Sequence, residues 1–251
     1  MLLRVLGAQG PEPGPGGATA GFLVESEGYR LLIDAGSGVA TRLTEHPEPD
    51  AVFLSHFHWD HMADLGVVGY RHLRRRRADP RLAPLPLLFP QGAWAAGEEL
   101  ATLGVFDAVE VRDGESRALG PLTLSFAATV HPVPCLAVRV EDREGCTLAY
   151  TADTRYHEPL ARRLEGADLL LVEAATTEAH AEVKALGHQS AMEAGRLAQE
   201  SGAAGALLVH LPPDQDPVAA LVEAQGAFAP MRLGRSGQVW RIAHPAAAHA
   251  R

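Results

Sequence analysis

Residues 54–65, LSHFHWDHMADL, place three histidines and one aspartate within six positions, from His56 to His61. In an extended segment alternate side chains lie on the same side, so His56 and His58 can reach one metal ion. Where the chain turns into the following helix, Asp60 and His61 point in another direction and can reach a second ion. Imidazole and carboxylate ligands together suit zinc, manganese or iron. The segment therefore predicts part of a metal site.

The other ligands of such a site have to come from elsewhere in the chain, because six residues cannot complete two coordination shells. Three candidates directly follow apolar runs: His131 after LTLSFAATV, Asp153 after CTLAYTA, and His210 after GALLV. An apolar run of this kind is typical of a buried strand, and the residue after it lies at a rim of the sheet. The recurrence predicts that these side chains meet at one sheet edge.

The elements that must position these residues form two runs of strands, each followed by helical material. We expect strands over 2–7, 21–26, 29–36, 50–55, 85–89, 122–130, 135–140, 146–153, 167–175 and 205–210. Helices are expected over 61–77, 92–104 and 190–202. This order predicts an α/β fold in which two sheets pack face to face with helices outside. No linker or repeat interrupts it, so residues 1–251 are expected to form a single domain.

Composition limits the classes of function. The chain has 251 residues, and 47% of them are hydrophobic, which is ample for a sizeable core. A formal net charge of -9 disfavours an extended nucleic-acid interface, whereas a small anionic substrate is compatible with it where metal ions offset the charge.

Cys135 and Cys146 lack the spacing of a thiolate metal site, so buried, reduced thiols are expected. The sequence has neither a membrane-span pattern nor a signal-peptide pattern, which predicts a cytoplasmic protein without membrane contact.

The stretch HFHWDH matches the HxHxDH motif of the metallo-β-lactamase superfamily, and the three strand-end residues follow in the family's order. LLIDAG resembles the first family motif, whose aspartate, here Asp34, supports the site from behind. The resemblance covers about residues 2–242. It implies an αββα sandwich of two mixed β-sheets flanked by helices, with two divalent metal ions at one edge, zinc being expected and manganese the alternative. It assigns the first ion to His56, His58 and His131, the second to Asp60, His61 and His210, and the bridging position to Asp153.

Within the superfamily, residues 169–213 resemble ribonuclease Z and its phosphodiesterase relatives, in which a Glu and a His act as a pair near the metals. Here the pair is Glu173 and His188, although Val172 stands where the ribonuclease has a His. The ribonuclease also carries a long arm that grips transfer RNA between the third-motif histidine and the bridging aspartate. Only 21 residues separate His131 from Asp153, which leaves no room for an arm. The chain is therefore more similar to the compact bacterial phosphodiesterases of this branch, some of which hydrolyse cyclic nucleotides.

The resemblance implies hydrolysis in which two ions about 3.5–4 Å apart activate a bridging hydroxide and clamp the phosphoryl oxygens. Asp60 would orient the hydroxide. His188, charged or oriented by Glu173, would protonate the departing alkoxide. The expected substrate is a small phosphodiester or nucleotide, such as a cyclic nucleotide, or a short RNA end.

Other functions stay open. A carboxylic hydrolase, such as a lactonase, thioesterase or lactamase, can use the same binuclear site, because fold does not fix function; the Glu173 and His188 pair favours the phosphodiesterase, since acyl hydrolases of the family generally lack it. A nucleotide-binding regulator with slow turnover is disfavoured by the intact ligand set. An iron oxidoreductase is disfavoured because redox members usually carry Glu where His58 stands.

Some roles have structural alternatives. Glu173 and His188 could instead form a buried salt bridge at a helix cap. Phe57 and Trp59 could wall the substrate pocket or pack in the core. The histidines outside the site, including His72, are expected at the surface. The native metal, the natural substrate and the oligomeric state stay open, and a homodimer is possible.

Overall fold

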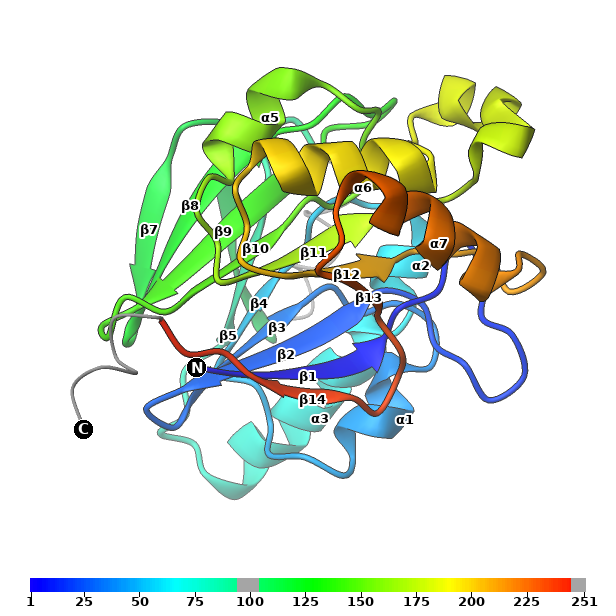
Figure 1. The fold of residues 1–251 in the computed structure, drawn as a ribbon. Helices are drawn as coiled ribbons and strands as arrows, with labels where there is room; N and C mark the ends of the chain where they lie inside the picture. Colours follow the sequence, from blue (N-terminus) through cyan, green and yellow to red (C-terminus); the bar gives the residue numbers. More distant parts are fainter. Residues whose placement is uncertain (94–103, 245–251) are drawn as a thin grey trace.

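Two seven-stranded sheets form the centre of the protein (Figure 1). The computed structural model describes residues 1–93 and 104–244, so the helix expected over 92–104 lies almost wholly outside the described residues. The first sheet has the order β14 (Val239–Arg241), β1 (Leu2–Gly7), β2 (Gly21–Ser26), β3 (Tyr29–Ile33), β4 (Ala51–Phe53), β5 (Leu85–Pro90) and β6 (Phe106–Val111). The second has the order β13 (Met231–Leu233), β12 (Ala206–Val209), β11 (Leu169–Glu173), β10 (Thr147–Tyr150), β9 (Leu136–Asp142), β8 (Leu122–Ala128) and β7 (Ser116–Leu119).

The alternation of side chains along each strand produces the layers. In β2, Phe22 and Val24 belong to the core between the sheets, and Leu23 belongs to the core on the outer face. In β11, Leu171 faces the other sheet while Leu170 packs under the helices. Strands that are buried on both faces need apolar residues at every position, which is why they read as continuous hydrophobic runs in the sequence.

Helices cover the outer face of each sheet (Figure 1). α1 (Val39–Leu43) and α3 (Leu65–Ala78) pack on the first sheet, and α5 (Glu158–Arg163), α6 (Ala191–Glu200) and α7 (Pro217–Ala227) pack on the second. A 3₁₀ segment, η1 (Glu178–Leu186), precedes α6. α6 begins with a capping box, in which the Ser190 hydroxyl accepts from the Glu193 amide and the Glu193 carboxylate accepts from the Ser190 amide. The expected αββα sandwich is confirmed.

The single helix expected over 61–77 is wrong in its first turn. A short helix, α2 (Trp59–Met62), ends before α3 begins at Leu65. Between them Asp64 is held by tertiary hydrogen bonds: its amide donates to the Ala35 carbonyl at 2.9 Å, and its Oδ2 accepts from the Ala40 amide at 2.9 Å. These contacts turn the chain at a position that helical periodicity does not mark.

The strand directions bring one set of strand ends together. β3, β4 and β5 run parallel, and so do β10, β11, β12 and β13. β9 is antiparallel to both β8 and β10, so β8 and β10 point the same way. The carboxyl ends of β8, β10, β11 and β12 therefore lie at one edge of the second sheet. β9 and β10 are the strand hairpin expected between His131 and Asp153.

Candidate metal centre

The predicted metal ligands lie in segments that follow strands of both sheets. The segment 54–61 follows β4 in the first sheet. His131 follows β8, Asp153 follows β10 and His210 follows β12 in the second sheet. The structure brings all seven predicted ligands into two adjoining groups, which share Asp153: His56, His58, His131 and Asp153 in the first, and Asp60, His61, His210 and Asp153 in the second.

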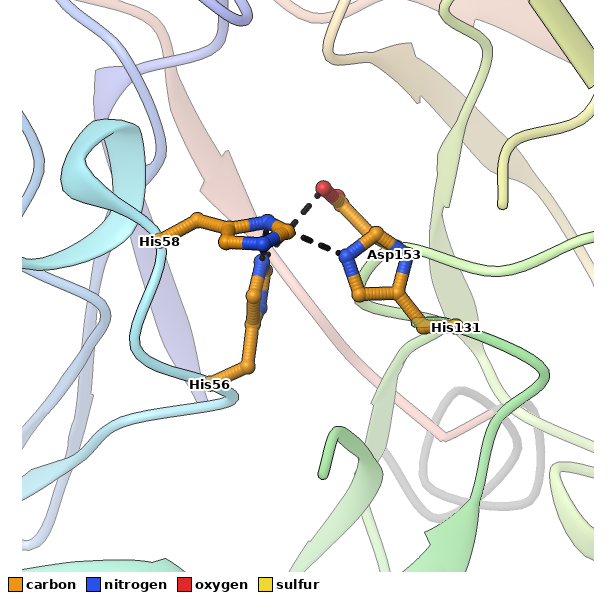
Figure 2. Close-up of side chains that lie close together, drawn as sticks. All are labelled: His56, His58, His131 and Asp153. Atoms are coloured by element: carbon orange, nitrogen blue, oxygen red, sulfur yellow. Dashed lines mark hydrogen bonds and ion pairs between the residues drawn. The ribbon is translucent and has the colours of Figure 1, made fainter. Parts of the chain in front are cut away.

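In the first group, His56 and His58 approach from one side, and His131 and Asp153 approach from the other (Figure 2). His58 Nδ1 lies 3.1 Å from His56 Nε2 and 3.1 Å from His131 Nε2. His56 Nε2 lies 3.6 Å from Asp153 Oδ2. Three ring nitrogens and one carboxylate oxygen therefore converge on a single point.

Hydrogen bonds behind the rings fix which nitrogens carry lone pairs. His131 Nδ1 lies 3.1 Å from the Gly187 carbonyl, which can only accept, so Nδ1 carries the proton and Nε2 the lone pair. The Ser55 hydroxyl donates its one proton to Asp34 Oδ2 at 2.8 Å and therefore accepts from His56 Nδ1 at 3.0 Å. Burial holds the pKa of His56 well below its ordinary value and also lowers that of His131, so both rings are neutral and able to ligate a cation.

The second group is assembled in the same way. His210 Nε2 lies 3.0 Å from Asp60 Oδ2 and 3.4 Å from Asp153 Oδ2. His61 Nε2 lies 3.4 Å from Asp60 Oδ2 and 3.3 Å from Asp153 Oδ2. His61 Nδ1 donates to Asp34 Oδ2 at 2.8 Å, so the Nε2 lone pair of a neutral His61 faces the two carboxylates.

The chemistry of these groups fits a divalent cation. His61 Nε2 and Asp153 Oδ1 are buried and have no hydrogen-bond partner within the described chain. Burial opposes charge on His61, but the carboxylates of Asp153 and Asp34 outweigh it and raise its pKa well above the ordinary value. The carboxylates thus require a positive charge at this position. A cation bound by the imidazoles and carboxylates would supply it, and this donor set suits zinc, manganese or iron.

A hydrogen-bond network behind the site holds the ligands in orientation. Asp34, fully buried, accepts from the Ser55 amide at 2.7 Å through Oδ1. Its Oδ2 accepts from the Ser55 hydroxyl, from His61 Nδ1, and from the Tyr150 hydroxyl at 3.2 Å. The support expected of Asp34 is therefore present. Ser55 and Tyr150 were not expected, although the position of Ser55 directly before the first histidine was a signal that could have identified it.

The backbone at the site is unusual. Asp34, Ala152 and His210 have left-handed conformations, with φ of 57°, 51° and 64°. Such conformations are costly for residues other than glycine and are typical of functional sites. Gly10 packs directly on the His210 ring, since a Cβ there would lie 2.2 Å from His210 Nε2. The Gly-rich loop that precedes β2 is therefore part of the site.

The Glu173 and His188 pair lies beside the two groups. His188 Nδ1 is 3.2 Å from Glu173 Oε1, and the His188 ring centroid is 5.4 Å from those of both His131 and His210. Burial lowers the pKa of His188, but the hydrogen bond and the charge of Glu173 outweigh it and raise the value to about 9. Burial raises the pKa of Glu173, partly offset by His188.

Glu173, His188 and His210 are close enough to form a third group of potential ligands. The Glu173 carboxylate is, however, already used by protein donors. Oε1 accepts from the Thr154 amide at 2.9 Å as well as from His188, and Oε2 accepts from the Ala175 amide at 3.1 Å. The carboxylate is therefore positioned to orient His188 and not to bind a metal.

A cavity of about 730 Å³ adjoins the site, with His188 and His210 in its wall. We call it the side cavity. The rest of its wall comes from residues 11–12, from the segment after β11 with η1, and from residues 212–219. Its volume is within the usual range for small-molecule sites.

The structure also places the aromatic, histidine and cysteine residues that lie outside the predicted ligand set. Phe57 packs on Phe89, with ring centroids 5.6 Å apart, whereas Trp59 is 78% exposed. The surface position expected for His72 is wrong, because this side chain is buried and its Nε2 bonds to the Ala83 carbonyl at 2.9 Å. Cys135 and Cys146 are buried free thiols, as expected. No helix in residues 1–93 and 104–244 has the length and apolar character needed to cross a membrane.

Comparison with known proteins agrees with this geometry. Residues 29–211 match the model of the beta-lactamase superfamily domain. The probable metallo-hydrolase YhfI of Bacillus subtilis is 32% identical over 96% of this chain and 99% of its own length, and its crystal structure superposes over 95% of this chain and 98% of its own with a TM-score of 0.90.

Two further relatives are informative. Ribonuclease Z of Methanopyrus kandleri is 27% identical over 96% of this chain and 98% of its own length. A diphosphatase from the PhnP family shares the fold, with a TM-score of 0.77 over 95% of this chain and 96% of its own at 17% identity. The chain therefore belongs to the metallo-β-lactamase superfamily, as a metallo-hydrolase similar to the ribonuclease Z branch.

Proposed function

We propose that this protein is a phosphodiesterase that hydrolyses a small phosphodiester, such as a cyclic nucleotide or a short RNA end, with two divalent metal ions. The observation that carries the proposal is the Glu173 and His188 pair beside the metal ligands, with Nδ1 and Oε1 3.2 Å apart. A ribose alkoxide is a strong base and needs a proton in order to leave. A histidine held by a buried carboxylate is suited to supply that proton.

The roles of the ligands follow from the two groups. His56, His58 and His131 would hold one ion, Asp60, His61 and His210 the other, and Asp153 would contact both. When bound, the ions would activate water and stabilise the phosphoryl oxygens. Asp60, whose Oδ2 lies 3.0 Å from His210 Nε2, would orient the attacking water. His188 would hold the proton for the leaving oxygen, and Glu173 would keep its ring in place.

The names of the relatives support chemistry at phosphorus: ribonuclease Z and a diphosphatase of the PhnP family. The short connection between His131 and Asp153 supports a small substrate, because the β9–β10 hairpin occupies it and a long arm for transfer RNA would have no place there. A single domain and a cytoplasmic location remain part of this proposal.

The experiment is a substrate panel with the zinc-loaded and manganese-loaded protein. We expect turnover of bis-p-nitrophenyl phosphate and of cyclic AMP, and little turnover of a lactone or a β-lactam. Preferred hydrolysis of the lactone or β-lactam would replace the proposal with a carboxylic hydrolase.

A further inference from the structure

Apart from three histidines, of which His188 and His210 belong to the proposed site, the ionisable side chains of the side cavity are carboxylates. Among the described residues that line it, none is a lysine or arginine. Three of its lining residues are carboxylates, Glu12, Asp214 and Asp216, and all three residues are exposed. Asp216 Oδ1 accepts from the Val218 amide at 2.8 Å and so caps α7. We call Glu12 and Asp214 the mouth carboxylates, because both are exposed residues of the cavity wall.

Much of the remaining wall is apolar, and it also contains the side chains of Thr177, His180 and Gln215. Pro11, Pro212, Pro213 and Leu186 contribute apolar surface. Gln215 donates from Nε2 to the Ala175 carbonyl at 3.2 Å, while its Oε1 is buried without a hydrogen-bond partner in the described chain. Beside the histidines and Thr177, the cavity therefore offers apolar surface and the Gln215 acceptor, which suit an uncharged group that carries N–H or O–H donors.

The side cavity adjoins the metal groups, so part of a bound substrate would have room there. His188 and His210 form part of its wall, and these residues belong to the phosphate-cleaving site proposed above. Arg235 lines a neighbouring cavity that shares Pro212, Pro213 and Gln215 with the side cavity but contains no residue of the metal groups.

We propose that the side cavity selects substrates with one phosphoryl group, by accepting an uncharged, donor-bearing group such as a nucleoside and by repelling a second phosphate. The inference rests on the proposed phosphodiesterase function and adds the class of substrate. At the dielectric constant of a hydrated surface, repulsion between a terminal phosphate and the two mouth carboxylates gives roughly a tenfold preference, in kcat/KM at low salt, for the substrate that lacks this phosphate. The preference weakens as salt is added.

The test uses two dinucleotides, ApA and pApAp. Whichever half of pApAp enters the cavity carries an extra phosphate, so the orientation of binding does not affect the result. We expect kcat/KM at low ionic strength to be about tenfold lower for pApAp than for ApA. In the double variant Glu12→Lys with Asp214→Lys the ratio of pApAp to ApA should rise at least tenfold, and 0.5 M salt should reduce both effects.

The matched control is Asp107→Lys with Glu165→Lys. It changes the net charge equally at two exposed carboxylates, which lie in β6 and before β11, near the opposite ends of those strands. Its substrate ratio should equal that of the native protein. Metal content and melting temperature check that each variant is folded, and the milder Glu12→Gln with Asp214→Asn should shift the ratio in the same direction.

Two results separate failure of this inference from failure of the proposed function. If bis-p-nitrophenyl phosphate is hydrolysed but pApAp is used as well as ApA, or if the control changes the ratio as much as the cavity variant, the inference is overturned and the phosphodiesterase stands. If none of the three phosphodiesters is hydrolysed by the metal-loaded protein, the phosphodiesterase is overturned, and the inference with it.

Discussion

The role of His188 can be measured through the basicity of the leaving group. If His188 donates the proton, its removal should matter most for a ribose oxygen, whose alkoxide is too basic to leave unaided. It should matter little for p-nitrophenolate, which leaves without a proton. General acid catalysis contributes about 10²–10⁴ in rate, or about 2.7–5.4 kcal/mol at 1.36 kcal/mol per tenfold. His188→Ala should therefore lower kcat for cyclic AMP by at least about 100-fold and kcat for bis-p-nitrophenyl phosphate by less than about tenfold.

The structure sets the conditions of this assay. The His188 side chain is 16% exposed and lines the side cavity, and the Glu173 side chain that pairs with it is fully buried. His188 is not in either group of metal ligands, and metal content should be unchanged in the variant. His244→Ala is the matched control, because His244 Nδ1 pairs with Asp168 Oδ1 at 3.3 Å near the opposite end of β11. This control should leave both rates unchanged.

A structural role for His188 predicts another result. A histidine that only caps a helix or fills a salt bridge would reduce both rates equally and modestly, and would lower the melting temperature. Equal losses of kcat for the two substrates, with intact metal content, would refute the proton-donor assignment and would favour the carboxylic hydrolase.

Four further outcomes are expected. Glu173→Gln removes the charge that raises the pKa of His188 to about 9. Since a general acid is lost as pH rises through its pKa, the alkaline limb of the kcat profile should move to lower pH in this variant. In the native protein that limb should lie below about 9, because bound cations also lower the pKa of His188, and an unchanged limb in the variant would contradict the pairing. Elemental analysis should find two divalent ions per native chain, and at least one fewer in His58→Ala; no metal after reconstitution would refute the site. Ser55→Ala should weaken metal binding about 10–100-fold in a chelator competition, because it removes the acceptor of His56 Nδ1. Precursor transfer RNA should be cleaved poorly compared with a small phosphodiester, and efficient cleavage at physiological salt would show that the missing arm does not limit the substrate.

The positions of three metal ligands could be predicted because a residue type that binds metals directly follows an apolar run at each of them. His131, Asp153 and His210 each follow an apolar run, and the parallel direction of those strands brings their ends to one edge. The network behind the ligands could not be predicted. Tyr150 and Asp34 are 116 positions apart, and their hydrogen bond exists only once the sheets pack face to face.

Local pattern also failed where tertiary contacts decide the structure. The break at Asp64 depends on Ala35 and Ala40 of the preceding segment, not on helical propensity. α7 was not expected, although Asp216 followed by Pro217 is a helix-start signal that was present in the sequence. The burial of His72 depends on the segment around Ala83, which no short-range pattern indicates.

The ligands of the first group come from both layers of the sandwich: His56 and His58 follow β4 of one sheet, whereas His131 and Asp153 follow strands of the other. An ion held by all four would act as a cross-link between the sheets at this edge, much as a disulfide joins two strands. Its binding energy would then count towards the docking of the two sheets as well as towards catalysis. Metal depletion should therefore loosen the sandwich from the catalytic edge inward, and metal supply would influence how long the folded protein persists as well as how fast it works.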